Sequence, residues 1–325
     1  LTFTPVAASG ATSTLWGILQ HGATYYAVGN GGALVTTTTP SGTWTPAAAS
    51  PLGGGANLRS ISYLNNSLYV ITGNNATLLT SGDGATWTSR TTLVSHTGSD
   101  FLYGAAYGNG VYVAVGGNNN NLNYVFTSTD GSNWTQRSLG IGNTFRAVVF
   151  YQGYFTAVGN LGAVYRSANG VNWSFVDAGT EADFGGLSVR DGRYYAAAGA
   201  SGSGFGSSFP VGPQAVMLVS SDGVHWAQTD RGAANNAYSV ELFNGRLYTS
   251  GDNFSIQRSE VIAASSVHAP VPVTPAPASS VNQGTNHVLA VTSDTSGGQT
   301  FVWTKNESVI PGVTGPALAL KNVHF

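Results

Sequence analysis

Residues 145–173 read FRAVVFYQGYFTAVGNLGAVYRSANGVNW, and this stretch contains the unit that decides the fold. Runs of four to seven residues rich in Val, Tyr and Phe alternate here with the turns Gln152-Gly153 and Asn169-Gly170. Such runs, bounded by x-Gly or Asn-Gly turns, indicate antiparallel hairpins. The stretch therefore predicts four short strands, at 145–150, 154–159 and 163–167 and from Trp173 onward.

The same unit recurs along the chain. Cassettes of the form Ser-x-Asp/Asn-Gly-x-x-Trp begin at Ser81, Ser128, Ser167 and Ser220, and a degenerate copy ends at Trp44. The successive tryptophans are 43, 47, 39 and 53 residues apart. An aromatic strand that ends in glycine occurs six times, at Gly29, Gly73, Gly116, Gly159, Gly199 and Gly251. Four strands in each period of this length are typical of the blades of a β-propeller.

The two ends of this region predict how the ring closes. The sixth repeat has its aromatic strand and a third strand at 254–258, but no turn cassette follows. Residues 1–9, LTFTPVAAS, align with 43–50, TWTPAAAS, which is the outer strand expected for the first blade. We therefore predict a six-bladed propeller over residues 1–262, with a closing strand from the N-terminus that protects a sheet edge.

The turn cassettes carry a family resemblance. They resemble those of the Asp-box (BNR-repeat) propellers, a group that includes sialidases, sortilin-type receptors and photosystem II assembly-factor-like proteins. In this chain the Gly follows the Asp directly and the Trp comes one residue early. The resemblance covers roughly residues 1–260 and implies the fold without implying an activity. A short carboxylate or amide can accept the N–H groups of its own turn, so we predict structural roles for Asp83, Asp130, Asn169 and Asp222.

The composition changes after the repeats. Residues 263–284 are rich in Pro, Ala and Ser, with prolines at 270, 272, 275 and 277, which indicates a semi-rigid linker. Residues 285–325 alternate as strands, and the run from Trp303 through Ile310-Pro311-Gly312 to Val323 resembles bacterial Ig-like domains. Trp303 would be the core tryptophan of such a sandwich. We expect an incomplete Ig-like domain, so the whole chain is predicted to be all-β, a propeller plus a partial β-sandwich.

Composition limits the classes of function. Only 8% of residues are charged, the net charge is -2 and cysteine is absent. Disulfides and thiolate metal sites are therefore excluded, and no basic excess favours nucleic acid. No apolar run is long enough to span a membrane, and no signal peptide is recognised at Leu1. A surface rich in Ser, Thr, Asn and Gly favours a secreted or cell-surface protein.

Catalytic motifs are not found. The Arg-Ile-Pro motif of sialidases is absent, and the six histidines lack metal-ligand spacing. No nucleophile elbow or phosphate-binding loop is present, and we identify no pair of carboxylates suited to glycoside hydrolysis. We therefore predict no catalytic residue, no metal and no cofactor.

One face of the propeller is the candidate for binding. The residues seven positions before the first turn of each repeat are expected at the mouths of the inner strands: Leu15, Arg59, Tyr103, Arg146, Gly185 and Tyr238. Arg59, Tyr103, Arg146 and Tyr238 could hydrogen-bond and stack a sugar or an anionic group. They could instead simply line a narrow channel, since most polar channel residues only satisfy one another. The long insertions 117–123 and 200–214 lie on the same face, and the second offers Phe205 and Phe209.

Two classes of function follow. The first is a non-catalytic extracellular binding module for a glycan or a protein. The second is a structural or adhesive subunit of an extracellular assembly, in which the open edge of the Ig-like domain pairs identical chains. A glycosidase-like enzyme is a distant third.

Overall fold

The computed structural model describes residues 14–47, 56–90, 100–118, 122–137, 139, 142–199, 216–229, 237–243, 246–251, 256–258, 287–290, 304–305, 308–309 and 317–320. The chain divides into two compact units, Leu1–Ala263 and Ala264–Phe325. Throughout the described residues, the only helical segment is the single 3₁₀ turn η1 (Asn30–Gly32). The protein is therefore an all-β structure in the part that is described.

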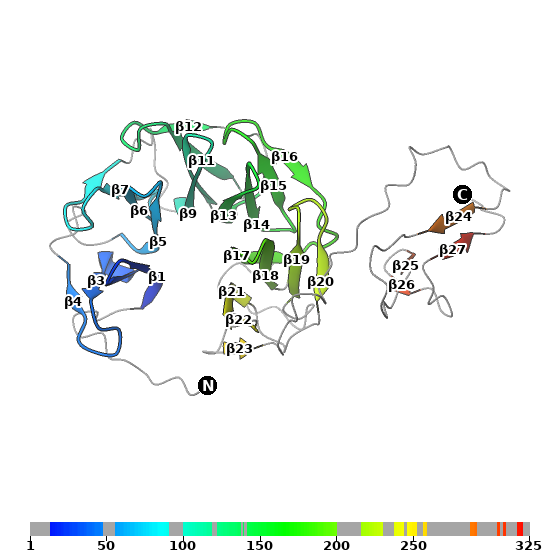
Figure 1. Cartoon of the computed structure of the whole chain (residues 1–325). Helices are drawn as coiled ribbons and strands as arrows, with labels where there is room; N and C mark the ends of the chain where they lie inside the picture. The colour runs from blue at the N-terminus through cyan, green and yellow to red at the C-terminus, as the bar shows by residue number, and fades with distance from the viewer. Residues whose placement is uncertain are drawn as a thin grey trace. The chain divides into compact units, whose positions relative to one another are not determined.

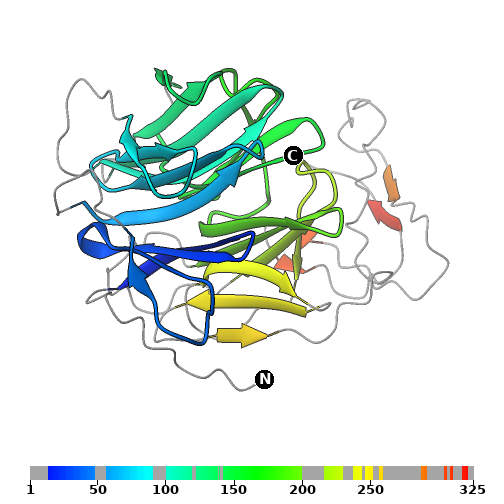
Figure 2. The same cartoon turned by 60° about the vertical axis from the view of Figure 1, so that its left-hand side comes forward.

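The first unit is a β-propeller (Figures 1 and 2). Five four-stranded antiparallel sheets follow one another in chain order, and each is ordered from its inner to its outer strand as the chain runs. The first two sheets contain β1 (Leu15–His21), β2 (Thr24–Gly29), β3 (Leu34–Thr37) and β4 (Thr45–Pro46), then β5 (Leu58–Leu64), β6 (Leu68–Gly73), β7 (Leu78–Ser81) and β8 (Thr88–Ser89).

The next three sheets repeat this pattern. The third sheet contains β9 (Asp100–Gly108), β10 (Val111–Asn118), β11 (Asn123–Ser128) and β12 (Thr135–Arg137). The fourth contains β13 (Phe145–Tyr151), β14 (Tyr154–Gly159), β15 (Val164–Ser167) and β16 (Ser174–Val176). The fifth contains β17 (Asp183–Arg190), β18 (Arg193–Gly199), β19 (Val216–Ser220) and β20 (Ala227–Thr229).

The sixth sheet corrects the prediction of six complete blades. It has only three strands in the described residues, β21 (Ala237–Phe243), β22 (Arg246–Gly251) and β23 (Ile256–Arg258), so five blades are complete. Each of the other five repeats has a turn cassette before its outer strand, and this repeat has none. Its own sequence therefore does not supply a fourth strand. Residues 1–9, which were predicted to supply it, lie outside the described residues.

The second unit contains two strand pairs. β24 (His287–Ala290) pairs with β27 (Ala317–Leu320), and β25 (Thr304–Lys305) pairs with β26 (Ser308–Val309), both antiparallel. The predicted linker 263–284 and Trp303 lie outside the described residues. The Ig-like sandwich therefore stays a prediction.

The hydrophobic core of the propeller lies between neighbouring sheets. Tyr26 and Val28 of β2 pack with Ile61 and Ile71 of the second sheet in one such layer. Similar layers join the second sheet to the third, the third to the fourth and the fourth to the fifth. Burying large apolar side chains removes apolar surface from water, at about 25 cal/mol per Å². The second, third and fourth sheets are consequently each held by apolar layers on both sides.

The glycine that ends each aromatic strand has a steric cause. Gly159 pairs with Phe145 across the β13–β14 hairpin. A Cβ added to Gly159 would lie well inside van der Waals contact of the Thr144 carbonyl group. The equivalent Gly29, Gly73 and Gly116 meet the carbonyls of Thr14, Asn57 and Phe101 in the same way. The recurring glycine therefore permits a close approach of two strands.

The turn cassettes are built as predicted from local hydrogen bonds. In the second sheet, Asp83 Oδ1 accepts the N–H groups of Ala85 (2.9 Å) and Thr86 (2.7 Å), and the Ser81 hydroxyl accepts that of Gly84 (2.9 Å). Asp130, Asn169 and Asp222 accept the corresponding pairs of N–H groups in their own turns. An amide oxygen thus replaces the carboxylate at Asn169 with no change in the pattern.

These hydrogen bonds lower the pKa of the turn carboxyls. The pKa values of Asp83 and Asp130 lie well below the usual range, mainly because backbone N–H groups stabilise the charged form. For Asp222, burial favours the neutral form, but the N–H groups of His225 and Val224 outweigh it and lower the pKa to about 2. A depressed folded-state pKa stabilises the fold above the unfolded value of about 3.9, and this stabilisation is lost as the pH falls.

We expect Gly159→Ala to lower the free energy of unfolding by about 3 kcal/mol, because the new methyl group displaces the segment before β13. Urea unfolding monitored by tryptophan fluorescence measures this change. The control is Gly82→Ala, whose Cβ would have no neighbour within 4 Å, and which we expect to change stability by less than about 0.5 kcal/mol. Equal effects of the two substitutions would contradict the steric explanation.

We expect Asp222→Asn to retain the stability of the parent at neutral pH, because Asn169 shows that an amide satisfies the same turn. Between about pH 4 and about pH 2 the variant should lose less stability than the parent, since it has one fewer carboxyl to protonate. The reciprocal Asn169→Asp variant should lose more. Urea midpoints at several pH values test both, and identical acid sensitivity in all three proteins would exclude the model.

Candidate functional site

Every inner strand of the propeller has a β-bulge at the same end. The pairing of each inner strand with its neighbour skips one residue, for example between Leu58 and Ser60 in β5 and between Phe145 and Ala147 in β13. A bulge inserts one extra residue on one strand and redirects its side chain. The six skipped residues are Trp16, Arg59, Tyr103, Arg146, Gly185 and Tyr238.

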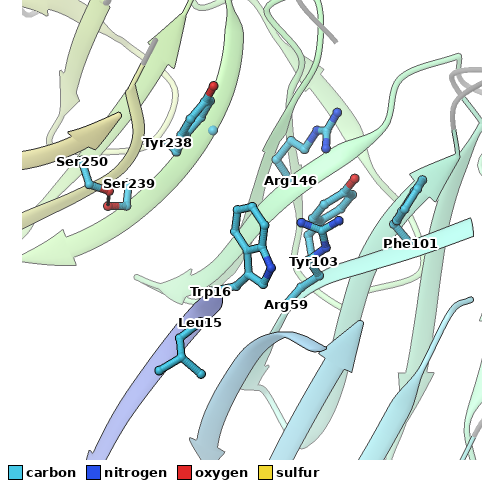
Figure 3. A pocket seen from close by; sticks show the side chains of 10 residues that line it. Leu15, Trp16, Arg59, Phe101, Tyr103, Arg146, Tyr238, Ser239 and Ser250 are labelled. Atoms are coloured by element: carbon cyan, nitrogen blue, oxygen red, sulfur yellow. Dashed lines mark hydrogen bonds between the residues drawn. The ribbon is translucent and has the colours of Figure 1, made fainter. Parts of the chain in front are cut away.

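These bulge residues surround one pocket, which we call the bulge pocket (Figure 3). Its volume is about 550 Å³, and Leu15, Phe101, Ser239 and Ser250 complete its lining. This volume is typical of sites for small ligands. All six sheets thus contribute to the pocket.

The structure brings the four described binding candidates together. Arg59, Tyr103, Arg146 and Tyr238 all line the bulge pocket, as do Leu15 and Gly185. Their role in binding stays a prediction. The other two candidates, Phe205 and Phe209, lie outside the described residues.

Trp16 and Phe101 were missed by the sequence analysis. In the first repeat the turn reads Gly22-Ala23, with glycine at its first position, whereas the fourth repeat has Gln152-Gly153. In the first repeat, counting seven positions back from the glycine therefore selects Leu15. Counting seven positions back from the second turn residue selects Trp16. The hairpin register, in which His21 pairs with Thr24, shows the correct alignment.

Three bulge side chains are held by asparagine. In each case a side-chain N–H donates to the amide oxygen of the Asn that follows the recurring glycine. The pairs are Trp16 Nε1 with Asn30 at 2.6 Å, Arg59 Nε with Asn74 at 2.8 Å and Arg146 Nε with Asn160 at 3.0 Å. The Gly-Asn dipeptide at the end of three aromatic strands is the sequence signal for these tethers.

Aromatic rings fix the two arginines further. The Arg59 guanidinium carbon lies 4.7 Å from the centroid of the Trp16 ring, and that of Arg146 lies 4.5 Å from the Tyr103 ring. Tyr103 in turn stacks on Phe101 at a centroid distance of 5.7 Å. Cation–π contacts of this kind hold a guanidinium by its face. Because the Trp16 ring covers the face of the Arg59 guanidinium, the N–H groups of this guanidinium point outward in its own plane.

The pocket is electropositive and partly desolvated. Burial lowers the pKa of both Arg59 and Arg146, but an arginine stays protonated in proteins. Burial raises the pKa of Tyr103, and the two arginines oppose that rise, so the phenol is neutral at pH 7. The nearby charge of Asp183 partly opposes the lowering of the Arg146 pKa. None of the ten lining residues carries a carboxylate.

The described residues contain neither a metal-binding cluster nor a membrane-spanning helix. No group of three or more His, Cys, Asp or Glu side chains in this part of the chain is placed to hold a metal ion. Within the same residues, no helix has the length and hydrophobicity needed to cross a lipid bilayer.

Residues 8–138 match a family model. The matching family is the DUF6242 beta propeller domain. The chain is similar to this family over the first three sheets. No curated protein matches the sequence.

Solved structures share the propeller fold. YCF48 bound to D1 peptide superposes with a TM-score of 0.55 at 16% identity, covering 76% of this chain and 77% of that one. The extracellular domain of a hybrid two component system from B. thetaiotaomicron gives 0.57 at 11% identity, over 80% of this chain and 33% of the other. The GH74 enzyme of Niastella koreensis gives 0.51 at 18%, over 78% and 38%. These similarities establish a propeller, whereas the finer Asp-box assignment stays a prediction.

Proposed function

We propose that the propeller is a non-catalytic binding module that holds an acidic group of its ligand in the bulge pocket. The observation that carries this proposal is the convergence of Arg59 and Arg146, each fixed by an asparagine and an aromatic ring, on one pocket. Hydrogen bonds between a guanidinium and a carboxylate or phosphate are among the strongest in proteins. Because the side chains are already ordered, binding loses little side-chain entropy.

The lining supports binding rather than hydrolysis. Glycoside hydrolysis in its usual form needs two carboxyl groups on either side of the bond that breaks. The described lining instead supplies two cations, aromatic rings and the hydroxyl groups of Ser239 and Ser250. Such groups recognise an anion and stack on its flat faces, but they include no acid–base pair.

The proteins of similar fold include one described as bound to a peptide and one described as an enzyme. YCF48 is described as bound to a peptide, and another relative is an extracellular domain, whereas the GH74 protein is an enzyme. We propose a secreted or cell-surface location for this chain, on the basis of its low charge and its richness in Ser, Thr, Asn and Gly. The ligand in this proposal is a glycan or a protein that carries an acidic group.

We further propose that residues 1–9 cover the open side of the ring. In β1, Ile18 is 68% exposed, whereas Ile61, Val148 and Val240 at the same register position are 5–7% exposed because they pack on the preceding sheet. β4 (Thr45–Pro46) shows that the sequence Thr-x-Thr-Pro forms an outer strand here. Residues 1–9 contain the same Thr-x-Thr-Pro sequence and would form a strand that pairs with β23. This pairing would bring the sixth sheet into contact with Ile18.

We expect replacement of both Arg59 and Arg146 by alanine to weaken binding of acidic ligands by a factor of about ten to one hundred per arginine, the scale of a charged hydrogen bond. Labelled full-length protein on arrays of glycans and peptides, with and without acidic groups, provides the measurement. Arg90→Ala is the charge-matched control, because Arg90 binds Thr80 in the second sheet and does not line the pocket. Acidic ligands that bind the double variant as tightly as the parent would refute the proposal.

We expect Ile18→Ser to cost about 1.5–3 kcal/mol of stability if the first and sixth sheets close on this side chain. Gln20→Ser, an exposed neighbour on the same face of β1, should cost less than about 0.5 kcal/mol. Deleting residues 1–9 should remove the difference between the two substitutions. Urea unfolding of six proteins decides the matter: the parent and the deletion variant, each unsubstituted, with Ile18→Ser and with Gln20→Ser. Equal, small effects of the two substitutions in the undeleted chain would show that Ile18 remains exposed.

A further inference from the structure

Leu161 adopts a conformation that leucine disfavours. It occupies the turn between β14 and β15, where Leu161 and Gly162 both have positive φ angles, of 55° and 68°. The equivalent turns place Gly31-Gly32 in the first sheet and Asn75-Ala76 in the second. Glycine and asparagine adopt the left-handed region readily, whereas a bulky side chain there is strained. Leu161 is also 50% exposed, so burial does not offset the strain.

A second exposed leucine lies on the neighbouring sheet. Leu122 is 53% exposed in the connection from β10 to β11. Its N–H group donates to the Asn118 side chain at 3.1 Å, and its carbonyl accepts the Asn118 N–H at 2.9 Å. The Thr144 hydroxyl donates to the Asn118 carbonyl at 2.9 Å, which joins this loop to the segment before β13. Leu122 is therefore exposed, and its backbone is held by Asn118.

Both leucines lie at the pocket end of their sheets. In each sheet the bulge lies near the start of the inner strand. Because the inner and second strands are antiparallel, this start pairs with the end of the second strand. The connections that hold Leu122 and Leu161 leave from that same end. Leu161 directly follows Asn160, whose amide oxygen holds Arg146. We call Leu122 and Leu161 the apolar rim.

We propose that the ligand is a polypeptide segment, with a carboxylate in the bulge pocket and neighbouring aliphatic side chains on the apolar rim. This inference rests on the proposed binding function and specifies its ligand. The aromatic rings of the pocket can stack on a sugar or on a flat side chain alike, but the two exposed leucines match the aliphatic side chains that a polypeptide carries. The charge is complementary as well, because the cations of the pocket would face the acidic group of the segment.

The strain at Leu161 provides the test. Replacing Leu161 by Asn should leave the thermal midpoint unchanged or raise it, because Asn75 fills the equivalent turn. The same change should weaken peptide binding about tenfold, which is the loss expected when one apolar contact is removed. If Leu161 had only a structural role, its replacement would not combine an unchanged or higher thermal midpoint with weaker peptide binding.

The experiment selects a displayed library of random linear peptides on the immobilised full-length chain. The selected peptides are synthesised, and their affinities are measured for the parent, Leu161→Asn, the Arg59/Arg146 double alanine variant and Val224→Asn. Val224 is an exposed apolar residue in a turn cassette, where its N–H bonds to Asp222. We expect peptides that combine Asp, Glu or a free carboxyl terminus with Leu, Ile or Val. We also expect Val224→Asn to bind them like the parent.

The outcomes separate the two proposals. If acidic peptides bind Leu161→Asn as tightly as the parent, or if none is enriched, the polypeptide assignment is wrong. If instead an oligomer of galacturonic acid binds and the double arginine variant loses it, the binding function stands and the polypeptide assignment fails. If the selected peptides bind the double arginine variant unchanged, both proposals fail.

Discussion

The close approach of two backbones at the β-bulge is the constraint on which the rest of the propeller depends. At Gly159 the second strand of the sheet lies so near the Thr144 carbonyl that a Cβ cannot be placed between them. The same contact recurs at Gly73 and Gly116. Because the bulge adds one residue to the inner strand at this point, the strand can pair fully with its neighbour and still direct one side chain toward the pocket. The residue after the bulge is small in each case (Gly17, Ser60, Gly104, Ala147, Gly186 and Ser239).

This arrangement separates the residues that build the scaffold from those that give it chemistry. The glycine is required by the backbone, whereas the bulge residue one strand away varies among Trp, Arg, Tyr and Gly. The asparagine that follows the glycine connects the two, since it holds whichever donor the bulge presents, an indole in the first sheet and a guanidinium in the second and fourth. A constant frame can therefore carry a pocket whose chemistry changes without change in the strands.

The sequence predicts the repeating parts of this structure well because their causes are local. Hairpin turns, the turn cassettes and the aromatic strands all depend on residues within one repeat, and five complete blades follow them. The position of Arg59, Tyr103, Arg146 and Tyr238 in one pocket could be predicted because the distance from turn to bulge is constant. Trp16 was missed where the glycine shifted by one position within its turn. The number of complete blades was predicted wrongly, because the sixth repeat lacks the turn cassette that precedes the outer strand in the other five, and its sheet has three strands in the described residues.

The pocket is asymmetric, and Gly185 explains how. A Cβ at this bulge position would lie 2.7 Å from the Ala237 carbonyl oxygen and from the Tyr238 Cα, so β17 and β21 approach each other too closely for any side chain. The fifth sheet consequently contributes backbone where the second and fourth contribute arginines. Beside it the sixth sheet presents Ser239 and Ser250, whose hydroxyl oxygens are 2.7 Å apart. The cations of the pocket thus come from the second and fourth sheets and its aromatic rings from the first, third and sixth, while the fifth sheet contributes backbone and the sixth also two hydroxyl groups. The two cations of the pocket therefore lie beside Phe101 and Tyr103 of the third sheet, Arg59 at 6.0 Å from the Phe101 ring and Arg146 at 4.5 Å from the Tyr103 ring.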